Sequence, residues 1–332
     1  MNSHVDFLLS SMSPSLVELP PHVNPYHNDV VVYALLPPVH SLKIIPTYYI
    51  LKDAHEKGLL EGIHTIVENT SGNFGANLAI WAPHFGIKNV MLCIPNDLAE
   101  GKTATLKRYG VEMTVITRDN AIGGIALAKQ MGEQPGFFCP RQYDNEMNVY
   151  AHYDHTAPLI DRLTNEKTRI VFASVGTSGT IGGLSKFGWG KYGKGDYVVI
   201  GVLCAPKAEI PGARSRDRMK QIGLPWQTFA DDFVEVDTYN AYLTSKILDS
   251  NGFPAGPSSG MAYWGFLKFC ATGIANGSLD KYRDKGDGKI HVTVLFPDDA
   301  KNYSEKYPTI LRYEHLGSKK TIEPPTIEDY QI

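Results

Sequence analysis

Short apolar runs rich in β-branched residues alternate with amphipathic stretches along most of this 332-residue chain, and this alternation constrains the fold more than any other feature. The pattern repeats from Ile63 to Cys139 and starts again at about Thr156. Strands that alternate with helices favour a parallel sheet with right-handed crossover connections. Because the length leaves room for about two domains, we predict an α/β protein with two domains, each a mostly parallel sheet flanked by helices.

The turn signals between these stretches delimit the individual elements. Expected strands cover residues 63–67, 89–94, 111–116, 136–139, 169–174, 197–203, 233–236 and 290–296. Expected helices cover residues 44–58, 74–84, 99–109, 121–131, 156–163, a stretch from about 181, 239–249 and 258–274. The first 36 residues are predicted as an extended arm followed by one strand, and residues 205–232 as a long loop with short helical pieces.

Composition narrows the class of partner. Lys and Arg total 32 against 35 for Asp and Glu, so the net charge of -3 gives no global field that would attract nucleic acid or an anionic membrane. The four cysteines lie far apart and fit neither a disulfide framework nor a metal site such as a zinc centre, which favours a reducing, cytoplasmic location. No export signal or bilayer-spanning run is evident. A small-molecule partner is the remaining expectation.

One lysine stands inside an otherwise apolar run, P-P-V-H-S-L-K-I-I-P-T-Y-Y at residues 37–49. An amine flanked by Leu42, Ile44 and Ile45 is expected to be partly desolvated, which disfavours the ammonium and releases the free amine that an imine needs. The alternative is a surface lysine whose stem covers apolar neighbours. Lys43 is therefore the candidate that binds a cofactor covalently.

The turn T-S-G-N-F-G at residues 70–75 joins a predicted strand to a predicted helix. Its backbone N–H groups and hydroxyls point out of a helix N-terminus, where a carboxylate would bind. An ordinary helix cap, made by Thr70 or Ser71, is the alternative interpretation.

A second turn, S-V-G-T-S-G-T at residues 174–180, also follows a strand and opens a helix. Two glycines permit close approach of the backbone and three hydroxyls add donors, so a phosphate would fit. The turn has neither the G-K-S/T of a Walker loop nor the G-x-G-x-x-G dinucleotide spacing. An ordinary glycine-rich connection remains possible, and G-P-S-S-G at residues 256–260 reads by itself only as two serines that compete for a helix cap.

Together and in this order, the four stretches resemble the cysteine synthase and cystathionine β-synthase family of pyridoxal-phosphate enzymes, those of fold type II. The S-x-K at residues 41–43 resembles the Schiff-base motif of the family. T-S-G-N resembles its substrate-carboxylate loop, G-T-S-G-T its phosphate loop, and S-S-G at 258–260 the site whose first serine meets the pyridine nitrogen. The resemblance covers about residues 37–303.

The resemblance implies a role for each matching residue. Lys43 would form the imine with pyridoxal 5'-phosphate and then act as the base at the substrate Cα. Asn73 would contact the phenolic oxygen of the ring and Ser258 the ring nitrogen. The phosphate would bind Gly176, Thr177, Ser178, Gly179 and Thr180. The substrate carboxylate would bind Thr70, Ser71, Gly72, Asn73 and Gln142.

The resemblance also implies an architecture similar to the tryptophan synthase β subunit and a homodimer. A smaller nested domain, residues 41–149, would contain the lysine and the substrate loop. The larger domain, residues 1–40 and 150–332, would contain the phosphate loop and the ring-nitrogen serine.

The expected reaction is β-replacement on L-serine or an O-activated L-serine, through an aminoacrylate intermediate, by a small nucleophile to give cysteine or another β-substituted alanine. Net β-elimination of the dehydratase or desulfhydrase type is the second possibility, although the hydroxyl-rich phosphate loop resembles the synthases more. A third is a relative that binds ligand without turnover, because Ile44 and Ile45 replace the usual acidic residue and arginine. The basic loop at residues 207–220 suggests that Arg214, Arg216 or Arg218 binds the phosphate of O-phosphoserine.

Overall fold

A six-stranded sheet forms one half of the molecule in the computed structural model, which describes residues 8–70, 72–96, 98–116, 123–317 and 321–325. Its strand order is β1-β2-β10-β7-β8-β9, and all pairs are parallel except β1 with β2. The strands are β1 (Ser15–Glu18), β2 (Val30–Leu36), β7 (Ile170–Ser174), β8 (Val198–Cys204), β9 (Asp232–Val236) and β10 (Ile290–Leu295). Strand β8 is buried throughout because helices cover both faces of the sheet.

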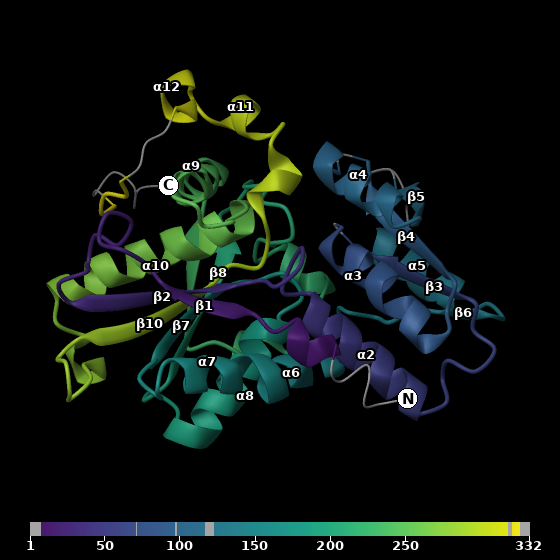
Figure 1. Cartoon of the computed structure of the whole chain (residues 1–332), viewed down its shortest axis with the longest axis horizontal. Helices are drawn as coiled ribbons and strands as arrows, with labels where there is room; N and C mark the ends of the chain where they lie inside the picture. Colours follow the sequence, from purple (N-terminus) through teal and green to yellow (C-terminus); the bar gives the residue numbers. More distant parts are fainter. Residues whose placement is uncertain (1–7, 71, 97, 117–122, 318–320, 326–332) are drawn as a thin grey trace.

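Two groups of helices cover this sheet (Figure 1). On one face lie α9 (Thr238–Ser250) and α10 (Pro257–Ala275), whose apolar side chains share a core with Val202 and Phe172. The other face is covered by α7 (Ala157–Leu163) and α8 (Gly179–Tyr192), which pack on Val171 and Val199.

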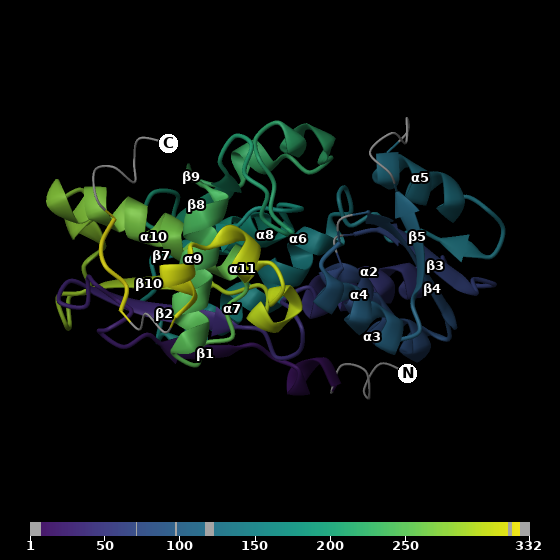
Figure 2. The same ribbon diagram turned by 90° about the horizontal axis from the view of Figure 1, so that it is seen from above.

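A separate four-stranded sheet forms the other half, with all strands parallel in the order β5-β4-β3-β6. The strands are β3 (Thr65–Asn69), β4 (Asn89–Pro95), β5 (Glu112–Ile116) and β6 (Phe137–Phe138). Helices α2 (Ile44–Glu56), α3 (Asn73–Trp81) and α4 (Glu100–Arg108) lie on one side and α5 (Gly123–Gly132) on the other, as Figure 2 shows from above. The α/β architecture with two mostly parallel sheets is confirmed, whereas the boundaries proposed for the two domains stay a prediction.

Two expectations from the sequence are wrong in detail. The N-terminal arm contains a strand, β1, which pairs with β2 by backbone hydrogen bonds that its short sequence S-L-V-E did not signal. The helix expected at residues 156–163 begins earlier, because α6 (Met147–Ala151) and a π-helical turn at His152–Thr156 run directly into α7. The expected loop at 205–232 is confirmed, with short 3-10 turns at Arg218–Gln221 and Trp226–Thr228.

The C-terminal segment contacts both halves of the molecule, because it packs against α9 and against α4. After β10 it forms a 3-10 turn at Ala300–Tyr303 and the short helices α11 (Tyr307–Ile310) and α12 (Tyr313–Leu316), shown in yellow in Figure 1. No helix among the described residues is long and apolar enough to cross a membrane.

The loops that follow β3 and β7 leave the carboxyl ends of strands in the two sheets, and both loops line one cavity. The carboxyl ends of parallel strands are the usual place for a ligand in α/β proteins.

Candidate active site

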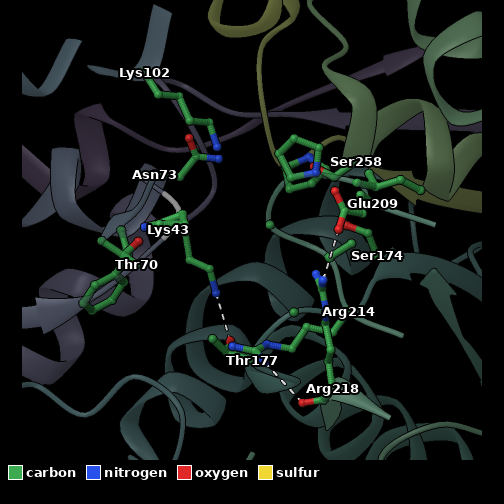
Figure 3. A pocket seen from close by; sticks show the side chains of 18 of the residues that line it. Lys43, Thr70, Asn73, Lys102, Ser174, Thr177, Glu209, Arg214, Arg218 and Ser258 are labelled. Atoms are coloured by element: carbon green, nitrogen blue, oxygen red, sulfur yellow. Dashed lines mark hydrogen bonds and ion pairs between the residues drawn. The ribbon is translucent and has the colours of Figure 1, made fainter. Parts of the chain in front are cut away.

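The side chain of Lys43 enters this cavity from the N-terminus of α2. The adjoining backbone is anchored to the segment that follows β10, because the Leu42 N–H donates to the Pro297 carbonyl at 3.2 Å. The Lys43 Nζ donates to Thr177 Oγ1 at 2.9 Å, the contact drawn in Figure 3. Burial lowers the pKa of Lys43 to about 8, so an appreciable fraction is the free amine near neutral pH.

The loop at residues 174–180, here called the cradle, lies at the N-terminus of α8. Ser178 adopts a left-handed conformation with φ of 66°, and the helix begins at Gly179. Among the described residues, no protein acceptor is hydrogen-bonded to the backbone N–H groups of residues 177–181. A Cβ on Gly176 would lie 2.3 Å from the Gly212 carbonyl oxygen, so the loop can pass there only as glycine.

Buried side chains behind the cradle determine where its hydroxyls point. Thr177 Oγ1 accepts hydrogen bonds from both Lys43 Nζ and Asn148 Nδ2, each at 2.9 Å. Because both of its lone pairs are used, the Thr177 hydroxyl proton is left to donate elsewhere. His152 holds the second threonine, with Nε2 3.2 Å from Thr180 Oγ1. Burial, with Lys43 and His155, lowers the pKa of His152 to about 3, so this histidine adds no charge.

The loop that follows β3 lies on the opposite side of the cavity. Thr70 Oγ1 accepts from the Gly72 N–H at 3.1 Å, which closes the turn. Gly72 has φ of 116°, and a Cβ there would lie 2.9 Å from Cδ of Lys102, so both conformation and space require glycine. Asn73 begins α3 and its side chain faces the cavity (Figure 3). Ser71 lies outside the described residues.

Gln142 is held against this loop by two bonds. Its Nε2 donates to the Asn69 carbonyl at 2.8 Å, and its backbone N–H donates to Glu68 Oε2 at 3.0 Å. The other Glu68 oxygen accepts from the Asn69 N–H at 2.9 Å. Burial raises the pKa of Glu68 to about 7. This buried carboxyl therefore fixes the position of Gln142 relative to Thr70.

Ser258 lies in the first turn of α10, is 4% exposed and lines the cavity. Beneath it, Asp298 Oδ1 accepts from the Ser259 hydroxyl at 2.9 Å. Burial raises the pKa of Asp298, while Lys102 and the hydroxyls of Ser258, Ser259 and Tyr303 oppose that shift. Ser258 lines the cavity and Asp298 does not, so this part of the wall presents a hydroxyl rather than a carboxylate.

The cavity has a volume of about 750 Å³ and brings most of the predicted residues together. Those that line it are Lys43, Thr70, Asn73, Gln142, Gly176, Thr177, Ser178, Thr180 and Ser258. Gly72 and Gly179 shape its loops without lining it. A pyridine aldehyde phosphate fits this set. The amine of Lys43 suits the aldehyde, the unpaired backbone amides of the cradle and the hydroxyl proton of Thr177 suit the phosphate, and the hydroxyl of Ser258 lines the same cavity.

Several cavity residues have no motif in the sequence. Lys102 comes from the charged helix α4, which resembles a solvated surface helix, yet it is 3% exposed. Burial lowers its pKa to about 8, with Asp298 acting in the opposite direction. Tyr143, Tyr242 and Lys306 also line the cavity. Asn148 and His152, which contact the two threonines of the cradle, lie in two short stretches that resemble the family, residues 142–148 and H-Y-D-H-T at residues 152–156.

The structure changes two expectations drawn from the sequence, one about Ile44 and Ile45 and one about Arg216. Ile44 and Ile45 are fully buried in the core of the smaller half and do not line the cavity, so they give no direct reason to expect altered specificity. Arg216 does not line the cavity either, because its side chain pairs with Glu235 at 2.7 Å. Arg214 and Arg218 do line it, on the side away from Asn73 and Lys102 in Figure 3.

Comparison with known proteins agrees with the geometry. Residues 18–278 match a family described as pyridoxal-phosphate dependent enzyme. Cysteine synthase B of Salmonella typhimurium is 28% identical over 233 residues, which are 70% of this chain and 76% of that protein. A probable cysteine synthase of Bacillus subtilis is 29% identical over 236 residues, 68% of this chain and 76% of that protein.

Solved structures share the fold. A variant of O-ureido-L-serine synthase with bound O-ureido-L-serine has a TM-score of 0.74 at 22% identity and covers 90% of this chain and 92% of its own. A hydrogen sulfide-producing enzyme from Fusobacterium nucleatum has a TM-score of 0.73 at 21% identity and covers 91% and 99%. The chain thus belongs to the cysteine synthase family of fold type II pyridoxal-phosphate-dependent enzymes, and its cofactor is pyridoxal 5'-phosphate.

Proposed function

We propose that this enzyme catalyses β-replacement on L-serine or an O-activated L-serine. In the net reaction the bond between Cβ and the leaving oxygen breaks, a bond from Cβ to the nucleophile forms, and the proton of the nucleophile goes to the leaving group. The observation that supports this best is the position of the Lys43 amine, which lines the cavity and lies 2.9 Å from Thr177 at the edge of the cradle.

Different residues around the cavity have different roles in this reaction. Pyridoxal phosphate, when bound, supplies the electron sink that acidifies the substrate Cα proton. Lys43 is the base placed to take that proton. Thr70 and Gln142 bind the substrate carboxylate, and the cradle at residues 176–180 binds the phosphate.

Ser258 supports loss of a β-leaving group over transamination. A hydroxyl cannot hold a pyridine nitrogen protonated as a carboxylate would, so the cofactor would be a weaker electron sink. The negative charge that develops at Cα is then relieved by loss of the leaving group from Cβ. The nearby carboxylate of Asp298 is engaged by Ser259. If the unsaturated product of that step is instead released and hydrolysed to a keto acid and ammonia, the result is net elimination, which is the competing outcome.

A non-catalytic role is less well supported, because Lys43, the cradle and Ser258 are all present and face one cavity.

The proposal includes a homodimer, which light scattering of the purified protein would test.

A donor and acceptor matrix tests the proposed function. Purified, cofactor-loaded protein is incubated with serine, O-acetylserine or O-phosphoserine, each with and without sulfide, and products are identified by mass. We expect cysteine with sulfide present, at a rate above the release of pyruvate. Pyruvate and ammonia as the main products, whatever the acceptor, would instead establish elimination.

A further inference from the structure

Glu68 lies in β3, two residues before Thr70, but it does not line the cavity. Its side chain is 1% exposed. Both of its oxygens accept from backbone N–H groups, Oε1 from Asn69 at 2.9 Å and Oε2 from Gln142 at 3.0 Å. The carboxylate therefore influences the proposed substrate site only through the backbone that it holds.

Gln142 is the residue through which Glu68 acts. The Gln142 carbonyl accepts from Asn148 Nδ2 at 2.7 Å, and the side-chain Nε2 donates to the Asn69 carbonyl at 2.8 Å. The same Asn148 amide donates to Thr177 Oγ1 in the cradle at 2.9 Å. The carbonyl side of Gln142 is thus fixed to the cradle, whereas its N–H is held by Glu68.

Protonation of Glu68 would weaken this arrangement. An ionised carboxylate accepts at both oxygens, whereas a carboxylic acid has a proton on one oxygen, which is then a poorer acceptor. One of the two backbone hydrogen bonds would be weakened as a result. Burial raises the pKa of Glu68 to about 7, and the charge of Asp144 adds to the rise, while the backbone N–H groups oppose it. The change between the two forms therefore falls near neutral pH.

The other ionisable side chains that face Glu68, among the described residues, keep a constant charge near neutral pH. Three of them are neutral: Cys93 on β4, and Cys139 and Tyr143 in the segment after β6. Burial raises the pKa of each, to about 11 for Cys93, and the charge of Glu68 adds to each rise. Only Glu68 itself is left to respond to pH in this range.

Asp144 is ionised in the same range. Burial would raise its pKa, but hydrogen bonds from Arg141 and Lys129 lower it overall. Its Oδ2 lies 2.7 Å from each of these two cations. With Glu68 ionised, the cluster has two acids and two bases and no net charge. Ionised Glu68 therefore exerts little repulsion on a carboxylate bound in the cavity.

We propose that Glu68 is a positioning residue, and that its ionised form is required for tight binding of the amino-acid substrate. This inference rests on the proposed function, in which Thr70 and Gln142 bind the substrate carboxylate. The ionised form holds the Gln142 backbone beside the loop that follows β3, and the protonated form loosens it. Since a hydrogen bond to a charged group is lost, we expect an effect on affinity of about tenfold. Cofactor affinity should not change, because Asn148 and Thr177 are bonded to each other without Glu68.

Glu68→Gln tests the proposal, because it keeps the shape of the side chain and removes the charge. L-Alanine has the carboxylate and the amine of the substrate but no leaving group, so its binding to the cofactor-loaded enzyme is measured without turnover, by the absorbance of the cofactor. At about pH 8 the Kd of the variant should be about tenfold higher than that of the wild type. Below about pH 6 the two values should converge, because Glu68 is then protonated in the wild type as well.

Comparison of the two proteins at each pH removes the effect of groups that titrate in both, such as the amine of alanine. Equal Kd values at about pH 8 would overturn the proposal. A constant difference at every pH would also overturn it, because Glu68 would then act through its shape and not through its charge. Tighter binding by the variant would show that charge repulsion dominates, which contradicts the proposal as well.

Glu112→Gln is the matched control, since Glu112 is an exposed glutamate on β5 of the same sheet and does not line the cavity. Its Kd for alanine should equal that of the wild type at every pH. Equilibrium dialysis should give the same cofactor affinity for all three proteins. A loss of cofactor affinity in Glu68→Gln would overturn the assignment to the substrate side.

Thermal unfolding separates positioning from a purely structural role. A buried carboxyl whose pKa is raised by folding stabilises the protein less once it is ionised, so its contribution is lost as pH rises through the folded pKa. At about pH 8 the Tm of Glu68→Gln should therefore equal or exceed that of the wild type. Weaker alanine binding together with a lower Tm would assign Glu68 a structural role and overturn the proposal.

Hydrogen exchange in the wild-type protein provides a test without any variant. The Gln142 N–H should lose protection as pH falls from about 8 to about 6, relative to the Val149 N–H, which donates to the Glu146 carbonyl at 2.8 Å. An unchanged ratio of the two would overturn the proposal. Absence of leaving-group release from every donor would mean that the proposed β-replacement fails, and the alanine measurement would still decide the role of Glu68.

Discussion

Lys43 Nζ and Thr177 Oγ1, 2.9 Å apart, join the start of α2 to the loop after β7. The lysine belongs to the segment that leads into the four-stranded half, and the threonine belongs to the six-stranded half. The same threonine oxygen accepts from Asn148, whose Nδ2 also donates to the Gln142 carbonyl at 2.7 Å. One hydroxyl therefore connects the candidate base, the cradle and the residue beside the loop that follows β3.

Lys43→Ala should abolish turnover while the protein stays folded. The change removes the amine that binds the cofactor and takes the Cα proton, and the side chain that is lost borders a cavity rather than a packed core. Steady-state rates and circular dichroism measure the two effects. A Lys43→Ala variant with normal activity would falsify the assignment of the active site.

Cofactor uptake by the cofactor-free protein should rise with pH and level off above about 8. Burial lowers the pKa of Lys43 to about 8, and only the free amine can attack the aldehyde. As pH falls through this value the amine becomes protonated, so the rate falls. Stopped-flow absorbance of pyridoxal phosphate against pH measures it. A rate still rising steeply at pH 10 would show that this lysine is not desolvated.

Thr177→Val should weaken cofactor binding at least tenfold, whereas Thr177→Ser should stay within about threefold. Valine keeps the shape but removes the acceptor for Lys43 and Asn148 and the proton left to donate to a phosphate. A lost hydrogen bond to a charged group costs about 1.5–3 kcal/mol. Equilibrium dialysis measures the affinity. Equal affinities for both variants would mean that this hydroxyl does not reach the phosphate.

Ser258→Asp should slow release of the leaving group relative to transamination, because a carboxylate would hold the ring nitrogen protonated. The structure adds a second effect. The new acid would lie beside buried Asp298, and two carboxylates so close cannot both ionise without cost, so the melting temperature should fall. Product analysis and thermal unfolding measure both, with Ser258→Ala as control. Unchanged product ratios would show that Ser258 does not face the ring.

The sequence predicted the parts of the site that depend on local structure. Lys43 at a helix entrance and the turns after β3 and β7 follow from glycines, hydroxyls and apolar runs that are contiguous in the chain. Lys102, Tyr242 and Lys306 could not be found in this way. Their own stretches predict ordinary helices and surface, and only the approach of α4, α9 and the C-terminal segment brings these side chains to the cavity.

Substitution of two neighbouring arginines tests whether O-phosphoserine is the donor. Arg214 lines the cavity, where its Nη1 donates to the Gln221 side chain at 3.0 Å and its guanidinium lies over the ring of Tyr143. Arg216 is two residues away but pairs with Glu235 outside the cavity. If O-phosphoserine is the donor, Arg214→Ala should raise its KM about tenfold or more, and the effect should shrink with added salt.

Arg216→Ala provides the control for loss of loop charge, and its KM for O-phosphoserine should change less than twofold. The KM for O-acetylserine should be unaffected by either substitution, because its leaving group carries no phosphate for a guanidinium to bind. Arg218, paired with Glu209 at 3.3 Å, should show an intermediate effect when changed to Ala. Equal effects of Arg214→Ala and Arg216→Ala would mean that the loop acts only through its overall charge. In that case the donor is better sought among uncharged esters of serine.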